Sequence, residues 1–370
     1  MKTTVREFFT SRALIIITGL VLGTLAAFLV FWGDPGNTGF APTCFLRDIS
    51  GALGLHEHIG FQYIRPVIIG LVLGSFVTAH IFREFRARGG SSPLVRFFLA
   101  MLLMVGALTF LGCPTRVILR LAGGDYGAIA GVAGLALGIF IGVFFLKRGF
   151  DLSRASPQST IAGWIMPVAM IGLLVPIILD AMGKPPSFIA FSDIGFGSFH
   201  APWLLALGAG LIVGGLAQRS RICFMGAWRD IFIIKNTYLM TGVASAFLAA
   251  LVFNIVLGQF HPGVVISENP LVLQPMSQPD LYWDFGGMVL VGLAACMLGA
   301  CPMRQIVLSG TGDIDAGVTV LGMLVGSALV RNLGASSCGG SLAWPFGPEA
   351  VVLGLGICVA FGFMMKLKKE

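Results

Sequence analysis

Seven cysteines are the most reactive side chains of this 370-residue sequence, and two of them stand in a duplicated context. Cys113 and Cys301 each begin the pattern Cys-Pro-x-Arg. In both places the Asp of a Gly-Asp pair follows twelve residues after the Cys. A shared pattern of this length is typical of an internal duplication. We therefore regard both cysteines as candidate functional residues.

A weaker duplication adds two further cysteines. Cys44 and Cys223 are each followed by Phe and, a few residues later, by Arg-Asp-Ile. A thiol is a weak hydrogen-bond donor with a soft, polarizable sulfur. Four such thiols suit a small sulfur or selenium anion with a soft terminal atom, because each site binds the ion weakly enough for it to move on.

Each Cys-Pro-x-Arg pattern predicts a broken helix. Pro114 and Pro302 disfavour helical geometry in the preceding Cys but suit the first turn of a new helix. We expect each Cys at the N-terminus of a short half-helix, where free N–H groups and the helix dipole attract anions. Arg116 and Arg304, about one turn further on, are predicted to attract the anion or to pair with nearby carboxylates. These carboxylates are Asp125 and Asp313.

The composition places these patterns in a membrane. Hydrophobic residues make up 56% of the chain and charged residues only 11%, and the mean hydropathy is +0.91. A soluble domain carries roughly a quarter charged residues, so a soluble enzyme, a disordered scaffold and a nucleic-acid-binding domain are excluded. The sequence predicts an all-α polytopic membrane protein, in which the net charge of +7 reflects the composition of the loops.

Apolar segments of membrane length predict about ten transmembrane helices. We place them at 13–32, 64–82, 97–111, 127–146, 161–182, 202–217, 238–258, 285–299, 316–330 and 350–365. With the N-terminus in the cytoplasm, 18 of the 24 Lys and Arg residues lie on the cytoplasmic side and 6 on the other. This distribution predicts that both termini are cytoplasmic. Gly-x-x-x-Gly spacings such as Gly19–Gly23 and Gly70–Gly74 predict helix-contact faces.

This topology predicts two inverted repeats. It places Cys44 and Cys113 on segments that enter from outside, and Cys223 and Cys301 on segments that enter from the cytoplasm. Inverted repeats with short re-entrant half-helices are common in transporters. The predicted organisation is a first repeat at 1–146, a connecting segment and helix at 147–200, a second repeat at 201–330, and a C-terminal loop and helix at 331–370.

The remaining cysteines receive no assigned function. Cys296 and Cys358 lie in apolar spans without a repeat partner and are predicted to pack as small hydrophobic residues. Cys338 lies in a predicted outer loop, and its role stays open. The sequence contains no Cys or His pairs at metal-binding spacing and no nucleotide-binding motif. We therefore expect no metal site and no cofactor.

The sequence resembles the YeeE/YedE family of sulfur-transport membrane proteins. The resemblance rests on the two Cys-Pro-x-Arg…Gly-Asp elements and on residues 221–230, RICFMGAWRD, and it extends over nearly the whole chain. The Cys-Pro-x-Arg version is similar to the YedE branch, whose members are regarded as selenium transporters. Many thiosulfate-type members have Gly-Gly-Cys without the following Pro-x-Arg.

The resemblance implies a bacterial inner-membrane protein in which a few axial cysteines relay the transported ion. By motif position it implies this role for Cys113, Cys301 and Cys44, whereas the role of Cys223 follows from the repeat within this sequence. We predict uptake of a small sulfur- or selenium-containing anion along these four thiols, which is transport and not enzymatic catalysis.

Two alternatives stay open. One is a membrane thiol protein that relays sulfane sulfur to a cytoplasmic sulfurtransferase, and the other is a soft-metal permease. Besides the anion and the lipid bilayer, the partner considered is a small cytoplasmic sulfur-carrier protein, and no nucleic acid is expected.

Overall fold

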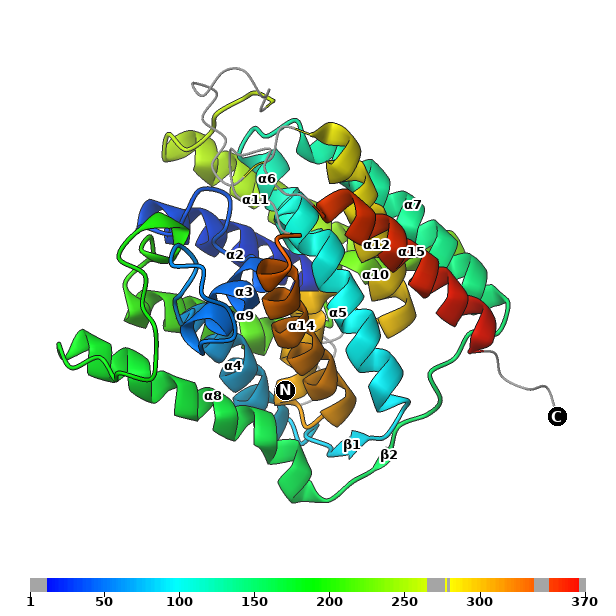
Figure 1. Cartoon of the computed structure of the whole chain (residues 1–370), viewed down its shortest axis with the longest axis horizontal. Coiled ribbons are helices and arrows are strands. Elements are labelled where there is room, and N and C mark those ends of the chain that lie inside the picture. Colours follow the sequence, from blue (N-terminus) through cyan, green and yellow to red (C-terminus); the bar gives the residue numbers. More distant parts are fainter. Residues whose placement is uncertain (1–11, 265–276, 278–279, 336–345, 366–370) are drawn as a thin grey trace.

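The computed structural model describes residues 12–264, 277, 280–335 and 346–365, and its regular structure is almost entirely helical (Figure 1). Ten apolar helices lie at the predicted positions. They are α2 (Arg12–Phe31), α4 (Pro66–Ile81), α5 (Pro93–Phe110), α7 (Ala128–Lys147), α8 (Thr160–Ala181), α9 (Trp203–Ser220), α11 (Tyr238–Val256), α12 (Leu281–Leu298), α14 (Ile314–Asn332) and α15 (Gly347–Met364). Among the described residues, nine helices are long and apolar enough to cross a membrane, and α4 is shorter at 16 residues. The predicted all-α polytopic fold is confirmed.

Four short helices lie between the apolar ones, and each has one of the repeated cysteines at its N-terminal end. They are α3 (Pro42–Ala52), α6 (Pro114–Ala122), α10 (Phe224–Ile234) and α13 (Pro302–Gly310). The remaining elements are η1 (Gly195–Gly197) and two short strands, β1 (Arg88–Gly89) and β2 (Ser156–Pro157), which pair in antiparallel orientation.

Three of the short helices follow an apolar helix after the same kind of break. Residues 111–113, 221–223 and 299–301 connect the two helices, and the first residue of each connection has a positive φ. Gly299 adopts this conformation without strain, whereas Leu111 and Arg221 do so at some cost. The third residue of each connection is the Cys, in extended geometry at the N-cap. The predicted break at each Cys-Pro is therefore confirmed.

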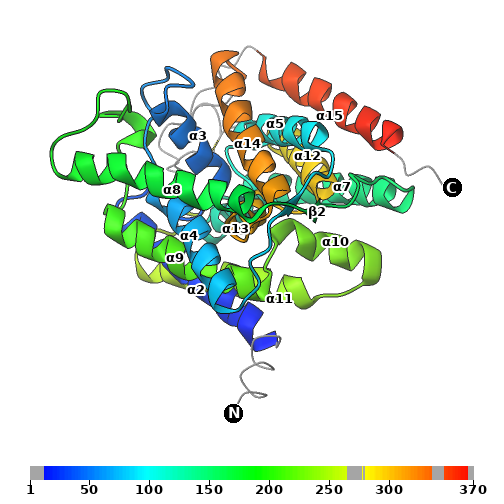
Figure 2. The same ribbon diagram turned by 90° about the horizontal axis from the view of Figure 1, so that it is seen from below.

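Corresponding helices of the two predicted repeats pack in corresponding pairs. Helix α2 packs on α11 as α9 packs on α4, and α7 packs on α12 as α14 packs on α5. Each pair joins one helix from each half, so the two halves interlock. Helices α8 and α15 lie on opposite sides of the bundle in Figure 1, and Figure 2 shows α8 across the front of the left half and α15 at the upper right. Helix α8 packs against α4, α13 and α14, and α15 packs against α5 and α12.

Glycine permits the close approach within these pairs. A Cβ atom at Gly19 would lie 2.2 Å from the Gly242 carbonyl oxygen on α11, and one at Gly74 would lie 2.1 Å from the Leu211 carbonyl oxygen on α9. Small residues let membrane helices pack backbone to backbone, which is the main source of their association energy. The predicted Gly19–Gly23 and Gly70–Gly74 contact faces are confirmed.

We expect Gly210→Ala to destabilise the protein, because its new methyl would lie 2.5 Å from the Val67 carbonyl oxygen on α4. Overpacking of this kind costs about 1–3 kcal/mol. Thermal unfolding of the purified protein in detergent measures the effect. Gly208→Ala on the same helix is the matched control, because it meets no atom within 4 Å. Equal melting temperatures for the two variants would contradict this account of α9 packing.

Candidate functional site

The N-terminal ends of α6 and α13 meet inside the bundle. The Thr115 hydroxyl lies 3.9 Å from the Met303 sulfur and donates to it, and both residues are buried. Each is the second residue after its Cys, so the contact joins corresponding positions of the two repeats. Helix α3 also contacts α13, and α10 contacts α6. The four short helices therefore converge on one region in the interior.

The structure places the four repeated cysteines at or near the starts of these helices. Cys113, Cys223 and Cys301 are N-caps, with Pro114 and Pro302 in the first turn of α6 and α13. Cys44 is the third residue of α3, whose N-cap is Ala41. All four are free, buried thiols. Cys338 lies outside the described residues.

Cys223 has the best-defined surroundings of the four. Its sulfur accepts hydrogen bonds from the backbone N–H groups of Gly226 at 3.3 Å and of Cys301 at 3.4 Å. The Cys301 thiol is also close enough to interact with this sulfur. Backbone donors at a helix N-terminus favour negative charge on a thiol or on a bound anion.

Cys223 also lines a cavity of about 590 Å³. A second cavity of about 390 Å³ adjoins the first, since Glu84, Arg221, Arg304 and Leu308 line both. Together they contain six arginines and two carboxylates, which are Arg86, Arg88, Arg219, Arg221, Arg229, Arg304, Glu84 and Asp230. The lining is therefore cationic, and Cys223 lies within reach of an anion held there.

Glu84 interacts with two of the arginines of this lining, Arg219 and Arg221. Burial raises the pKa of Glu84, but hydrogen bonds from Gln218 and Arg219 outweigh that effect and hold the pKa below its usual value. Its carboxylate is bound by Arg219 and also attracts Arg221, so one acidic side chain is shared by two of the six arginines of the lining.

The duplicated Arg-Asp pair differs in exposure between the two halves. Arg47 and Asp48 form an ion pair at 2.7 Å with both side chains 1% exposed, whereas Arg229 and Asp230 form the same pair at 3.0 Å with 29% and 23% exposed. The first pair is sealed by Arg65, which donates to Asp48 and to Asp34. Within the described residues, the Arg-Asp pair near Cys44 is therefore shielded from solvent, whereas the pair near Cys223 is accessible to solvent.

The arginines of the two Cys-Pro-x-Arg patterns contact backbone rather than the expected aspartates. Arg304 Nη1 donates to the Ala217 carbonyl oxygen at 2.8 Å, near the end of α9. Arg116 Nε donates to the Asn37 carbonyl oxygen at 3.3 Å, between α2 and α3. The ion pairs of Asp125 and Asp313 are formed with other arginines, and the attraction of an anion by Arg116 and Arg304 stays a prediction. Arg304, on α13, thus contacts the helix that precedes α10, and Arg116, on α6, contacts the segment that precedes α3.

The two aspartates pair with other arginines. Asp313 binds Arg88 at 2.9 Å at the surface, and Asp125 binds the buried Arg120 at 2.7 Å. Arg120 also pairs with Asp284 and donates to the Phe110 carbonyl oxygen at the end of α5. Neither Arg120 nor Asp284 has a role predicted from the sequence. Their charges within or beside apolar segments could have indicated a buried ion pair, because a charge inside a membrane is costly and needs a partner.

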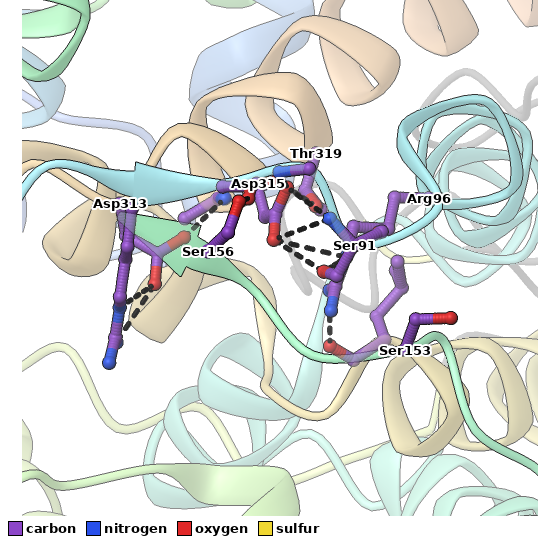
Figure 3. A network of polar contacts seen from close by, with 12 residues as sticks. Ser91, Arg96, Ser153, Ser156, Asp313, Asp315 and Thr319 are labelled. Carbon is purple, nitrogen blue, oxygen red and sulfur yellow. Dashed lines mark hydrogen bonds and ion pairs between the residues drawn. The ribbon is translucent and has the colours of Figure 1, made fainter. Parts of the chain in front are cut away.

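A polar network fixes the loop that carries Arg86 and Arg88 (Figure 3). Asp315, in the first turn of α14, accepts hydrogen bonds from the backbone N–H groups of Gly90 and Ser91 and from the Ser91 hydroxyl. Arg96 donates to Ser91 and to the Leu298 carbonyl oxygen, three residues before Cys301. The network therefore ties the cationic loop to the broken end of α12.

A comparison with known protein families bears on this arrangement. Residues 219–362 match the family model for sulphur transport. The matched segment contains Cys223 and Cys301 and most of the cationic lining, and it supports a role in the transport of a sulfur compound. This result agrees with the resemblance to the YeeE/YedE family. No curated protein matches the chain. Within the described residues, no group of three or more His, Cys, Asp or Glu side chains is placed to hold a metal ion.

We expect Arg120→Met to unfold or severely destabilise the protein, because it removes the arginine that forms ion pairs with the buried carboxylates of Asp125 and Asp284. Breaking a buried ion pair by removing one partner costs about 3–5 kcal/mol. The surface pair Arg88–Asp313 provides the control, since Arg88 is 50% exposed and Arg88→Gln should cost less than about 1 kcal/mol. Melting temperature and detergent-soluble yield report both effects, and a mild phenotype for Arg120→Met would count against its assigned role.

Proposed function

We propose that this protein imports a small anion with a soft terminal sulfur or selenium atom, such as thiosulfate or a selenium compound. The observation that carries the proposal is the position of four buried thiols at or near the N-terminal ends of four short helices, with Cys223 beside an arginine-lined cavity. The match to the sulphur-transport family model supports the same substrate chemistry.

The proposed path runs from Cys44 and Cys113 to Cys301 and Cys223. Each thiol donates weakly to the soft end of the anion, while half-helix N-termini offset its charge. The Thr115–Met303 contact lies between the two Cys-Pro segments and must separate for the anion to pass. Modest binding at several sites favours movement over retention.

The proposed direction is inward across the bacterial inner membrane, with both termini cytoplasmic. The cavity is lined by loops that the positive-inside rule assigns to the cytoplasm, including residues 84–88 and 219–221. The corresponding packing pairs of the two halves support an inverted-repeat organisation. A cationic cytoplasmic mouth would also suit a small acidic sulfur-carrier protein as the recipient.

Cys113→Ala and Cys301→Ala should each lower uptake of radiolabelled substrate by roughly tenfold to a hundredfold. Loss of one hydrogen bond to a charged group costs about 1.5–3 kcal/mol, and each 1.4 kcal/mol is a factor of ten. Cells expressing each variant are assayed with labelled thiosulfate and labelled selenium compounds. Cys358→Ala, on the peripheral helix α15, serves as the control and should transport normally. Undiminished uptake of every species by both variants would overturn the thiol path.

The orientation has a separate test. A small, charged methanethiosulfonate reagent should modify Cys223 in inverted membrane vesicles but not in intact spheroplasts, because Cys223 borders a cavity predicted to face the cytoplasm. Mass spectrometry of the digested protein identifies the modified residue, and Cys223→Ala removes the signal. Modification of Cys223 from the outside would reverse the proposed orientation.

A further inference from the structure

We propose that Cys223 and Cys301 form a reactive dithiol that reduces the sulfane sulfur of an anion in the inner cavity and becomes a disulfide. The inference rests on the proposed function, since it concerns the inner end of the same path. It adds a chemical step that simple passage of the anion does not require.

The two thiols are placed for sequential roles. Cys223 lines the cavity, whereas Cys301 is fully buried behind it. The Cys301 N–H donates to the Cys223 sulfur at 3.4 Å, and the two side chains are close enough to interact. An anion entering the cavity therefore meets Cys223 first, and any group attached to Cys223 stays within reach of Cys301.

The surroundings of Cys223 favour a nucleophile. Its sulfur accepts two backbone N–H bonds, from Gly226 in the first turn of α10 and from Cys301. The thiolate is the attacking form of cysteine, and helix N-termini and neighbouring cations stabilise it. Arg221 and Arg304 line the same cavity and can hold the sulfonate end of a thiosulfate-like anion. That end becomes the leaving group.

The first step forms one sulfur–sulfur bond and breaks another. The Cys223 thiolate attacks the terminal sulfur of thiosulfate, the bond between the two thiosulfate sulfurs breaks, and sulfite leaves with the electron pair of that bond. Cys223 then carries a persulfide anion. The negative charge of the thiolate has moved to the terminal persulfide sulfur, and no proton is transferred.

The second step uses Cys301. Its sulfur attacks the Cys223 sulfur, the persulfide bond breaks, and the terminal sulfur leaves as hydrosulfide with the proton of the Cys301 thiol. The two cysteines lose two electrons and form a disulfide, and the sulfane sulfur gains them. One turnover therefore needs no other reductant. A second turnover needs an external dithiol to reduce the disulfide.

The test begins with the purified full-length chain in detergent, reduced and then freed of reductant without air. Thiosulfate should release about one sulfite and one hydrosulfide per chain, with a Cys223–Cys301 disulfide detected by mass spectrometry. Added dithiothreitol should restore a second, equal release. The absence of sulfite and of the disulfide would overturn the proposal.

Variants separate the two steps. Cys301→Ser should release sulfite but no hydrosulfide and should retain a persulfide on Cys223, whereas Cys223→Ser should release neither product. Cys296→Ala is the matched control, because Cys296 lies on the adjacent α12 and faces Gly142 on α7. It should behave as the unmodified chain. Melting temperatures show whether each variant is folded. If Cys223→Ser does not fold, the release of sulfite and hydrosulfide by the unmodified chain tests the proposal alone.

Proteoliposomes distinguish this proposal from the proposed function. Thiosulfate is labelled with radioactive sulfur at either its terminal or its sulfonate position. Intact thiosulfate inside the vesicles, with no sulfite or hydrosulfide, would overturn the dithiol step and leave transport in place. Products formed in detergent without any entry of label into the vesicles would overturn transport and leave the dithiol step in place.

Discussion

A helix that is interrupted inside a membrane leaves carbonyl groups that no water can satisfy, and this requirement governs the architecture. Arginine meets it here. Arg120 donates to the Phe110 carbonyl oxygen at the end of α5. Arg304 adds a second donor to the Ala217 carbonyl oxygen near the end of α9, which also accepts the Arg221 N–H. A guanidinium offers five donors in a planar fork, so one side chain can satisfy a carbonyl and a carboxylate together, which lysine cannot do as well. The arginines therefore stabilise the chain close to the buried helix N-termini that hold the thiols.

The buried arginines also determine where the interior carries net charge. Around Cys44 and Cys113, the buried Arg47, Arg65 and Arg120 form ion pairs with Asp34, Asp48, Asp125 and Asp284, so these charges are neutralised within the bundle. Around Cys223 the arginines outnumber the carboxylates, and the excess faces a cavity. Both halves contain arginines near their helix breaks, but within the part of the chain that the structure describes, only those around Cys223 produce a cationic surface that attracts anions. The two halves share their packing pairs and differ in this balance of charge.

The sequence was sufficient for features that depend on local chemistry. Apolar length located the ten helices, Cys followed by Pro located the breaks at Cys113 and Cys301, and Gly-x-x-x-Gly located contact faces. The partners of Arg116 and Arg304 could not be found in this way. Aspartates twelve residues beyond each Cys lie nearby in the sequence, but the chain turns at Gly124 and Gly312 and presents them to Arg120 and Arg88 instead. The carbonyl that an arginine contacts depends on the packing of helices that are far apart in the sequence, so local sequence patterns do not predict it.

The differences between the thiols suggest a division of roles along the proposed path. A thiol that only passes an ion onward must bind it weakly, and Cys113, enclosed within the bundle, meets that condition. Cys223 instead has two backbone donors, neighbouring arginines and access to a cavity, which are the conditions of a nucleophile. A passive path moves an anion only down its electrochemical gradient. Conversion of the anion at the inner end would keep its intact concentration there low, so chemistry at Cys223 and Cys301 would give direction to a path that otherwise has none.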